Sequence, residues 1–222
     1  MTYKTDLHCH TSELSGCSSE SASDTVKRYA ELGYSSVVIT NHFRDHGRKK
    51  SGLHYKDYVD LHFEVAERAG REAAGKLHVI PGMELCLNSS ANDYLIFGAT
   101  REIMKGIPDI FRMELSDVHD YLSANGCLLI QAHPLRWGMT LIKPQHIDGY
   151  EVLNTHEYHQ NHNDVVMLLA KSIGGEGKIY TAGTDHHDAC QNPSSGIMTA
   201  EPIVNSAQLV QILKEGRYHI FG

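Results

Sequence analysis

The feature that most constrains this chain is a regular alternation of short apolar runs with longer amphipathic stretches. The short runs are rich in Val, Ile, Leu or Tyr, and several are bounded by Gly, Pro or Asn, which predicts β-strands. They cover residues 3–7, 35–40, 76–81, 93–98, 127–132, 149–153 and 178–183. The stretches with helical patterns cover residues 23–33, 56–75, 115–126, 163–175 and 205–216. This alternation predicts parallel strands joined by crossover helices.

About seven strands in a chain of 222 residues favour one α/β domain, residues 1–222, with a substantial core. A barrel or distorted barrel is the first expectation, and a doubly wound open sheet is the alternative. Helix ends are expected at Ser23 and Ser116, which are candidate N-caps, and at Gly33 and Gly126, which follow the helical patterns.

Composition limits the partners and the compartment. The net charge is −7, and no basic block suggests a dedicated surface for long nucleic acids. A short nucleic-acid end stays open as a substrate, because bound cations would add positive charge. No apolar run approaches the ~20 residues that span a bilayer, so no membrane association is expected. The N-terminus lacks the apolar segment of a signal peptide, and the five dispersed cysteines fit reduced thiols, which together predict a cytoplasmic protein.

Histidine is unusually frequent, with 16 His against 20 Lys plus Arg. Metal-ligand residues follow six of the predicted strands. They are Asp6, His8 and His10; His42; Glu84; His133; Glu151, His156 and His159; and Asp185, His186, His187 and Asp188. In a parallel barrel the carboxyl ends of all strands open on one face, which carries the active site. The sequence therefore predicts one site built from several strand ends.

The spacing within this set suits metal binding. His8 and His10 are two residues apart, so in an extended segment they point to the same side, and the same holds for Asp185 and His187. Cys9 then faces the opposite side and is expected to be buried. Mixed imidazole and carboxylate donors favour Zn, Mn, Fe or Co over Ca or Mg. A carboxylate such as Glu84 can bridge two cations, which is the two-metal arrangement of phosphate ester hydrolysis.

Six segments of the chain, in order, match a known family. They read "DLHCHT", "VVITNHF", "VIPGMEL", "IQAHPLR", "GYEVLN" and "GTDHH", and they run from residue 6 to residue 187. On these motifs the chain resembles the polymerase-and-histidinol-phosphatase (PHP) superfamily of metallo-phosphoesterases. The resemblance implies a distorted, TIM-like (β/α)7 barrel with the metal site at the C-terminal ends of the strands.

The resemblance also implies a ligand set for two or three divalent transition metals, Zn, Mn or Fe. The first metal would take His8, His10, Glu84 and Asp185. Glu84 would bridge to a second metal that also takes His133. The third metal would take His42 and His187.

Two departures from the family pattern affect these sites. Many members place an acid or a His where this chain has Ser15 and Gly16, and Glu13 is the nearest acid that could substitute as a ligand. Members also often have a His after the strand that follows the bridging Glu, whereas this strand ends "LIFGATRE". Asn92 and Asp93 precede that strand and would reach the site only if their loop folds back.

Three further histidines could compensate for the missing ligands. His156, His159 and His162 are spaced so that they would share one face of a helix, with His156 as an extra ligand. A solvated helix start is the alternative interpretation of these three residues.

These features predict a metal-dependent phosphatase of a small phosphorylated molecule, with a metal-bound hydroxide as nucleophile and no protein nucleophile. Arg136 is the candidate for binding the substrate phosphate, because a guanidinium matches phosphate bidentately. Weaker candidates are Arg44 and residues 48–50 for the rim of the site, and Tyr55 or Trp137 for stacking on a ring. The alternatives are a nuclease or nucleotide phosphatase on short nucleic-acid ends, and a non-catalytic metal-stabilised interaction module.

Overall fold

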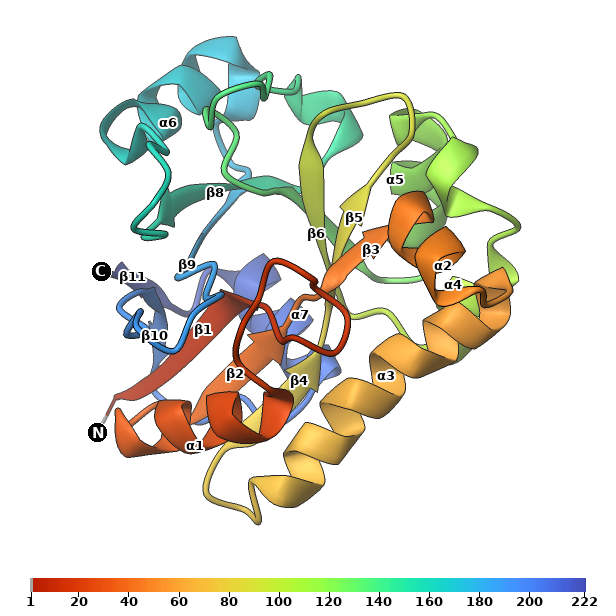
Figure 1. Cartoon of the computed structure of the whole chain (residues 1–222). Helices are drawn as coiled ribbons and strands as arrows, with labels where there is room; N and C mark the ends of the chain where they lie inside the picture. The colour runs from red at the N-terminus through yellow and green to blue at the C-terminus, as the bar shows by residue number, and fades with distance from the viewer. Residues whose placement is uncertain (1) are drawn as a thin grey trace.

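The computed structural model describes residues 2–222, shown in Figure 1. Its strands are β1 (Tyr3–Cys9), β2 (Ser36–Ile39), β3 (His42–Arg44), β4 (His78–Pro81), β5 (Met83–Cys86), β6 (Asp93–Phe97), β7 (Leu128–Gln131), β8 (Gly149–Asn154), β9 (Ile179–Gly183), β10 (Gly196–Thr199) and β11 (His219–Phe221). Its α-helices are α1 (Ala22–Glu31), α2 (Asp45–Ser51), α3 (Tyr55–Glu72), α4 (Arg101–Gly106), α5 (Leu115–Ala124), α6 (Asn163–Ala170) and α7 (Ser206–Glu215). Three short helical segments are η1 (Ile110–Arg112), η2 (Pro144–His146) and η3 (Lys171–Gly175). All seven predicted strands are present, and β3, β5, β10 and β11 were not predicted.

The strands form two sheets in a mixed α/β fold. One sheet has the order β11-β10-β1-β2-β4, and the other has the order β3-β5-β6-β7-β8-β9. The predicted barrel is therefore not one continuous hydrogen-bonded sheet. Within residues 2–222, no helix combines the length and the apolar character needed to cross a membrane.

Two stretches of chain pass from the first sheet into the second. β2 leads into β3 through Thr40 and Asn41, and β4 leads into β5 through Gly82 alone. A Cβ on Gly82 would lie 2.7 Å from Cγ1 of Val38, so this crossing requires a glycine for close packing of the two stretches. As a result β3 and β5 pair in parallel, with His42 directly opposite Glu84.

The prediction that neighbouring strands run parallel is wrong for β6. This strand is antiparallel to both β5 and β7. The connection from β5 to β6 spans only residues 87–92, which is too short for the crossover that parallel neighbours need. The N-terminal end of β6 therefore lies beside the C-terminal ends of β5 and β7, with Asp93 opposite Cys86.

The two sheets also meet between β1 and the segment after β9. Cys9 forms a parallel bridge with His186. The Asp185 N–H donates to the His8 carbonyl at 2.8 Å, and the His10 N–H donates to the His186 carbonyl at 2.9 Å. These bonds fix the ends of β1 and β9 against each other.

Helices cover the sheets and supply the core. α1 and α3 pack on the first sheet in an apolar cluster that also contains Cys9, which is buried as expected. α7 packs against apolar residues of both sheets, including Leu7 of β1 and Phe97 of β6. α4, α5 and α6 contribute to a third cluster with β5, β6 and β7. Full burial of each large aliphatic side chain contributes about 1.5–3 kcal/mol.

Two predicted helix caps are wrong. α1 begins after Ser21, whose side chain accepts from the Asp24 N–H, rather than at Ser23. α5 has Glu114 as its N-cap, without a side-chain cap hydrogen bond, so Ser116 lies inside the helix. The helix predicted over residues 163–175 ends as α6 at Ala170, and the segment η3 that follows is interrupted by non-helical backbone at Ile173 and Gly174.

His62 of α3 gives the fold a testable pH dependence. Its ring is 4% exposed, packs edge-on against Phe43 and Tyr58, and leaves Nε2 without a hydrogen-bond partner. Burial, with the nearby charge of His42, lowers the pKa of His62 to about 3. The depressed pKa means that the unfolded state binds the proton more tightly, so stability is lost as the pH falls below about 6.5.

We therefore expect His62→Leu to weaken the acid sensitivity of the metal-free protein. Between pH 7 and pH 5, the free energy of unfolding of the wild type should fall by about 2 kcal/mol more than that of the variant. Urea denaturation at the two pH values in the presence of a chelator measures this difference. The same substitution at exposed His219 is the control and should behave as wild type. Equal losses in wild type and His62→Leu would contradict the assignment.

Candidate metal centre

The structure brings all seven predicted metal ligands together at the ends of the central strands. The groups whose donor atoms all lie within 4.8 Å of one another are His8–His10–Asp185, His8–Glu84–His133, His10–His42–His187 and His156–Asp185–His187. The groups share members, so they form one continuous centre rather than separate sites. His42 and His187 are partly exposed at its edge, and the other predicted ligands are buried.

The first group lies where β1 meets the end of β9. Nε2 of His8 and Nε2 of His10 are 3.1 Å apart. Both face Oδ1 of Asp185, at 3.3 Å and 3.1 Å respectively. Asp185 has φ 56, in the left-handed region that costs a non-glycine residue roughly 1–2 kcal/mol. Such strain is typical of functional sites.

Glu84 of β5 occupies the middle of the centre. Its Oε1 lies 2.9 Å from Nε2 of His133 and 3.3 Å from Nε2 of His8. Its Oε2 pairs with Nδ1 of His42, the residue opposite it in the β3–β5 ladder. Burial alone would raise the pKa of Glu84, but the neighbouring imidazoles hold it well below its usual range. The carboxylate is therefore ionised and shared by several imidazoles.

Polar neighbours orient the two histidines of β1. Nδ1 of His8 lies 2.9 Å from Oε1 of Glu151, a carboxylate that can only accept, so this nitrogen carries the proton. Nδ1 of His10 lies 2.9 Å from Oγ of Ser15, whose own proton goes to Oδ1 of Asn41 at 2.9 Å. His10 therefore also donates through Nδ1. Both Nε2 lone pairs are left facing the centre, which is how protein ligands are held for a metal.

This arrangement fits a divalent cation. Two imidazole lone pairs 3.1 Å apart, beside the carboxylates of Asp185 and Glu84, repel one another unless positive charge lies between them. Although burial opposes charge on the ring, the surrounding carboxylates raise the pKa of His8 well above its ordinary value. Burial and the charges of His187 and His42 lower the pKa of His10. The donors are those preferred by Zn, Mn or Fe.

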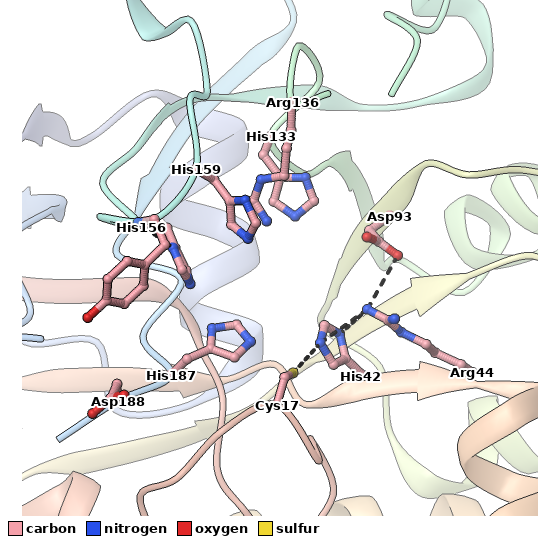
Figure 2. A pocket seen from close by; sticks show the side chains of 11 residues that line it. Cys17, His42, Arg44, Asp93, His133, Arg136, His156, His159, His187 and Asp188 are labelled. Carbon is pink, nitrogen blue, oxygen red and sulfur yellow. Dashed lines mark hydrogen bonds and ion pairs between the residues drawn. The ribbon is translucent and has the colours of Figure 1, made fainter. Parts of the chain in front are cut away.

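A cavity of about 360 Å³ opens above the centre and is shown in Figure 2. It is lined by Cys17, His42, Arg44, Asp93, His133, Arg136, His156, Tyr158, His159, His187 and Asp188. The cavity thus gives access to the predicted ligands at the edge of the centre, and it is bordered by two arginines.

Asp93 reaches this cavity because β6 runs in the reverse direction. It lies at the N-terminal end of β6, on the edge of the sheet where β5 and β7 end. Its Oδ1 is buried without a hydrogen-bond partner, and Nη2 of Arg44 lies 3.9 Å away. Burial and the charge of Glu84 raise its pKa. Asn92 is used elsewhere, because its Oδ1 accepts from the Thr140 N–H at 2.8 Å.

Arg136, the predicted phosphate-binding residue, lines the cavity. Its Nη2 donates to Oδ2 of Asp185 at 2.6 Å and to Oδ1 of Asn154 at 3.2 Å. Its Nε donates to Oδ1 of Asn161 at 2.9 Å. The guanidinium is thus held rigidly at the rim, with one edge against a predicted metal ligand.

The extra histidines adopt a different arrangement from the predicted helical face. Residues 155–162 form turns and irregular structure. His156 and His159 nevertheless both line the cavity, with ring centroids 4.7 Å apart. Burial lowers the pKa of His156 to about 4, so its ring is neutral at pH 7. His162 is the N-cap of α6 and is not among the residues that line the cavity.

The prediction for Glu13 is not supported by its contacts. Both carboxylate oxygens accept from the Ala22 N–H at 3.1 Å, at the start of α1, and Oε1 also pairs with Arg68 at 2.9 Å. The residue of this loop that contacts the side chain of His42 is Cys17, which sequence reasoning missed. The only indication in the sequence was that Cys17 carries a thiol in the same loop as Glu13.

Cys17 has an unusual environment for a partly exposed thiol. Its Sγ lies 3.1 Å from Nε2 of His42, and the ring of His187 lines the same cavity. Partial burial would raise the pKa of Cys17, but the neighbouring imidazoles of His187 and His42 outweigh this and lower it to about 6.

The weaker rim candidates have mixed outcomes. Arg44 lines the cavity, whereas Arg48 and Lys49 pair with Asp45 within α2. Lys50 borders a neighbouring cavity. The stacking prediction for Tyr55 is wrong, because its ring packs against Phe43 and Phe111 and its OH donates to the Met104 carbonyl at 3.0 Å. Trp137 is 95% exposed and is not among the cavity-lining residues.

The chain matches known proteins in its three-dimensional structure. No family model and no curated protein matches the sequence. A two-domain protein from Bacteroides vulgatus, described as containing a predicted PHP-like metal-dependent phosphoesterase, aligns with TM-score 0.65 and 16% identity. That alignment covers 100% of this chain, which spans 65% of the length of that protein.

Two further structures cover nearly the whole of both chains. An amidohydrolase from Chromobacterium violaceum, with bound sulfate and no metal, aligns with TM-score 0.56 and 14% identity over 97% of each chain. A protein from Bifidobacterium adolescentis described as a metal-dependent phosphoesterase aligns with TM-score 0.51 and 14% identity over 95% of this chain and 96% of that one. The chain therefore has the fold of PHP-like metal-dependent phosphoesterases, and the resemblance predicted from sequence is confirmed for the fold.

Because the carboxylate of Glu84 contacts several of the predicted metal ligands, we expect metal binding to depend on it. Adding Zn²⁺ or Mn²⁺ to metal-stripped wild type should raise its stability by about 2.7 kcal/mol at a hundredfold excess over Kd, which is about 5–10 °C in Tm. Glu84→Gln should lose most of this increase, because the carboxylate belongs to the middle of the centre. Differential scanning calorimetry with elemental analysis measures both effects. Glu64→Gln, on the exposed side of α3, should load as wild type. Full loading of Glu84→Gln would refute the assignment.

Proposed function

We propose that this protein is a metal-dependent hydrolase that cleaves the phosphate ester of a small molecule. The observation that carries the proposal is the convergence of buried imidazoles and carboxylates beneath a cavity bordered by Arg44 and Arg136. The donor set suits transition metals, and the arginines suit an anionic substrate. PHP-like metal-dependent phosphoesterases are among the proteins with this fold.

Two or three divalent cations, Zn, Mn or Fe, are proposed to be held by this centre. His8, His10, Glu84 and Asp185 would hold the first, and Glu84 and His133 the second, with Asp93 as an additional oxygen donor. His42 and His187 would hold the third. When bound, such cations activate water as a nucleophile near neutral pH and polarise a phosphoryl oxygen.

The protein's own residues orient and bind around this centre. Glu151 and Ser15 fix the rings of His8 and His10, so that their Nε2 atoms do not rotate away. Arg136 and Arg44 would neutralise the substrate phosphate from the cavity rim. The neutral ring of His156 is available to exchange a hydrogen bond with the ester or its leaving group.

The cavity favours a small substrate over a polymer. Its volume of about 360 Å³ lies at the lower end of the range for small-molecule sites. The net charge of −7 opposes tight binding of long nucleic acids. Short nucleic-acid ends and amides, the latter suggested by the Chromobacterium neighbour, are the alternatives that the substrate test separates.

We also propose that the two sheets together correspond to a distorted (β/α)7 barrel. The continuous paths β2–β3 and β4–β5 each count as one bent strand. With β6, β7, β8, β9 and β1 they complete a ring, because the Cys9–His186 bridge joins β1 to the end of β9. Antiparallel β6 is the main distortion, and its ladder hydrogen bonds to β5 and β7 support this proposal.

The substrate class can be tested by phosphate release. Metal-loaded wild type should hydrolyse members of a phosphomonoester panel, and a His8→Ala, Glu84→Ala double variant should be slower by about 10³-fold or more, since metal activation supplies several kcal/mol. Amides and short oligonucleotides belong in the same panel. A matched double variant at exposed positions, His219→Ala with Glu64→Ala, should retain full activity.

The results separate the candidate functions. If the His8→Ala, Glu84→Ala double variant hydrolyses phosphate esters as fast as wild type, with metal content controlled, the proposal is refuted. Cleavage of amides alone would assign an amidohydrolase, and cleavage of oligonucleotide ends alone would assign a nuclease. Inertness of folded, fully loaded protein would support a non-catalytic module.

The role of Arg136 is tested by separating KM from kcat. Arg136→Gln should raise KM about 10- to 100-fold, because a charge-assisted contact with an anion contributes about 1.5–3 kcal/mol. Arg136→Lys should recover part of the loss. Arg112→Gln, at an exposed position, is the control. A fall in bound metal with no change in KM would instead show that Arg136 acts by positioning Asp185.

A further inference from the structure

The outermost group of the centre has fewer donors than a metal needs. It contains His42, His187 and His10. Both nitrogens of His10 are already committed, since Nδ1 bonds to Ser15 and Nε2 faces Asp185 of the first group. His42 and His187 alone supply two donors, whereas a protein-bound Zn²⁺ usually takes three or four protein ligands.

The residue that lies between these two histidines is Cys17. Sγ of Cys17 is 3.1 Å from Nε2 of His42, and Cys17 lines the same cavity as His187. Figure 2 shows the thiol directed toward His42, with the rings of His42 and His187 on either side of it at the floor of the cavity. Three potential donor side chains from separate elements therefore lie beside one another at the cavity.

The loop that carries Cys17 is anchored to the same site. The Ser19 N–H donates to the His187 carbonyl at 2.9 Å, and Oγ of Ser18 donates to that carbonyl at 3.0 Å. On the other side of Cys17, the Ser15 N–H donates to the Thr11 carbonyl at 3.0 Å. The position of the thiol relative to His187 is thus fixed by the backbone on both sides, as a metal ligand requires.

We propose that the thiolate of Cys17 is a ligand of the third metal, completing a two-histidine, one-cysteine set with His42 and His187. The inference rests on the proposed metal-dependent function and names a ligand at one of its sites. The thiolate replaces the carboxylate donor that Glu13 was expected to supply.

The thiolate makes this site chemically different from the rest of the centre. Sulfur favours Zn²⁺ and other soft cations, whereas the carboxylate-rich groups around Glu84 and Asp185 accept Mn²⁺ and Fe²⁺ as well. Metal sites of different selectivity would therefore lie close together in one chain. The third site should prefer Zn²⁺ over Mn²⁺.

Cobalt substitution tests the ligand by spectroscopy. The full-length chain, stripped of metal and kept reduced, is titrated with Co²⁺. Wild type should develop a near-ultraviolet thiolate-to-cobalt charge-transfer band, and Cys17→Ser should lack it and bind one equivalent fewer or bind that equivalent at least about 10-fold more weakly. Cys17→His should recover the equivalent without the band. Cys190→Ser, at an exposed thiol outside the cavity lining, should match wild type.

Two results would overturn the inference. One is fully loaded wild type without the charge-transfer band, and the other is Cys17→Ser that binds the same number of cobalt ions with the same affinity. Failure of the proposed function gives a different result. If the protein is inactive on every ester, but wild type shows the band and Cys17→Ser does not, the ligand assignment stands and the proposed function is rejected. If the protein is active but wild type lacks the band, only the ligand assignment is rejected.

Discussion

The rest of the site depends on one buried carboxylate, Glu84. It contacts His8, His42 and His133, which come from three different parts of the chain. A buried carboxylate must be compensated by positive charge, so these imidazoles are drawn to one point, and the β3–β5 register places His42 opposite Glu84. The same electrostatic demand makes the centre suitable for divalent cations, whose charge satisfies both the carboxylates and the imidazole lone pairs.

The topology determines which further residues reach this carboxylate. Because β2 and β4 lead directly into β3 and β5, two short paths cross from one sheet to the other beneath the cavity. Because β6 is reversed, the start of that strand, rather than its end, faces the centre and presents Asp93. The bonds between β1 and the segment after β9 then bring His8 and His10 against Asp185.

Much of this could be predicted from the sequence, because strand runs and ligand residues are local patterns. The seven predicted ligands from His8 to His187 followed from their places after apolar runs and from the family motifs, and the structure gathers them in four groups. Strand direction is not local, so the reversal of β6 was missed, although the short connection over residues 87–92 was a signal. Asp93 was expected to reach the site only if its loop folds back, whereas the reversed strand brings it there. Ser15 and Cys17 were also missed, because their contacts depend on how one loop folds over His42 and His187. Helix caps at Ser21 and Glu114 differ from the predicted serines because several polar residues compete at each helix start.

An anomalous-scattering map of crystals grown with excess Zn²⁺ tests whether a multinuclear metal centre is built around Glu84. We expect one peak within bonding distance of Nε2 of His8, Nε2 of His10 and Asp185, a second peak between Glu84 and His133, and a third beside His42 and His187. A map from metal-replete crystals without a peak near His8 and Asp185 would contradict it.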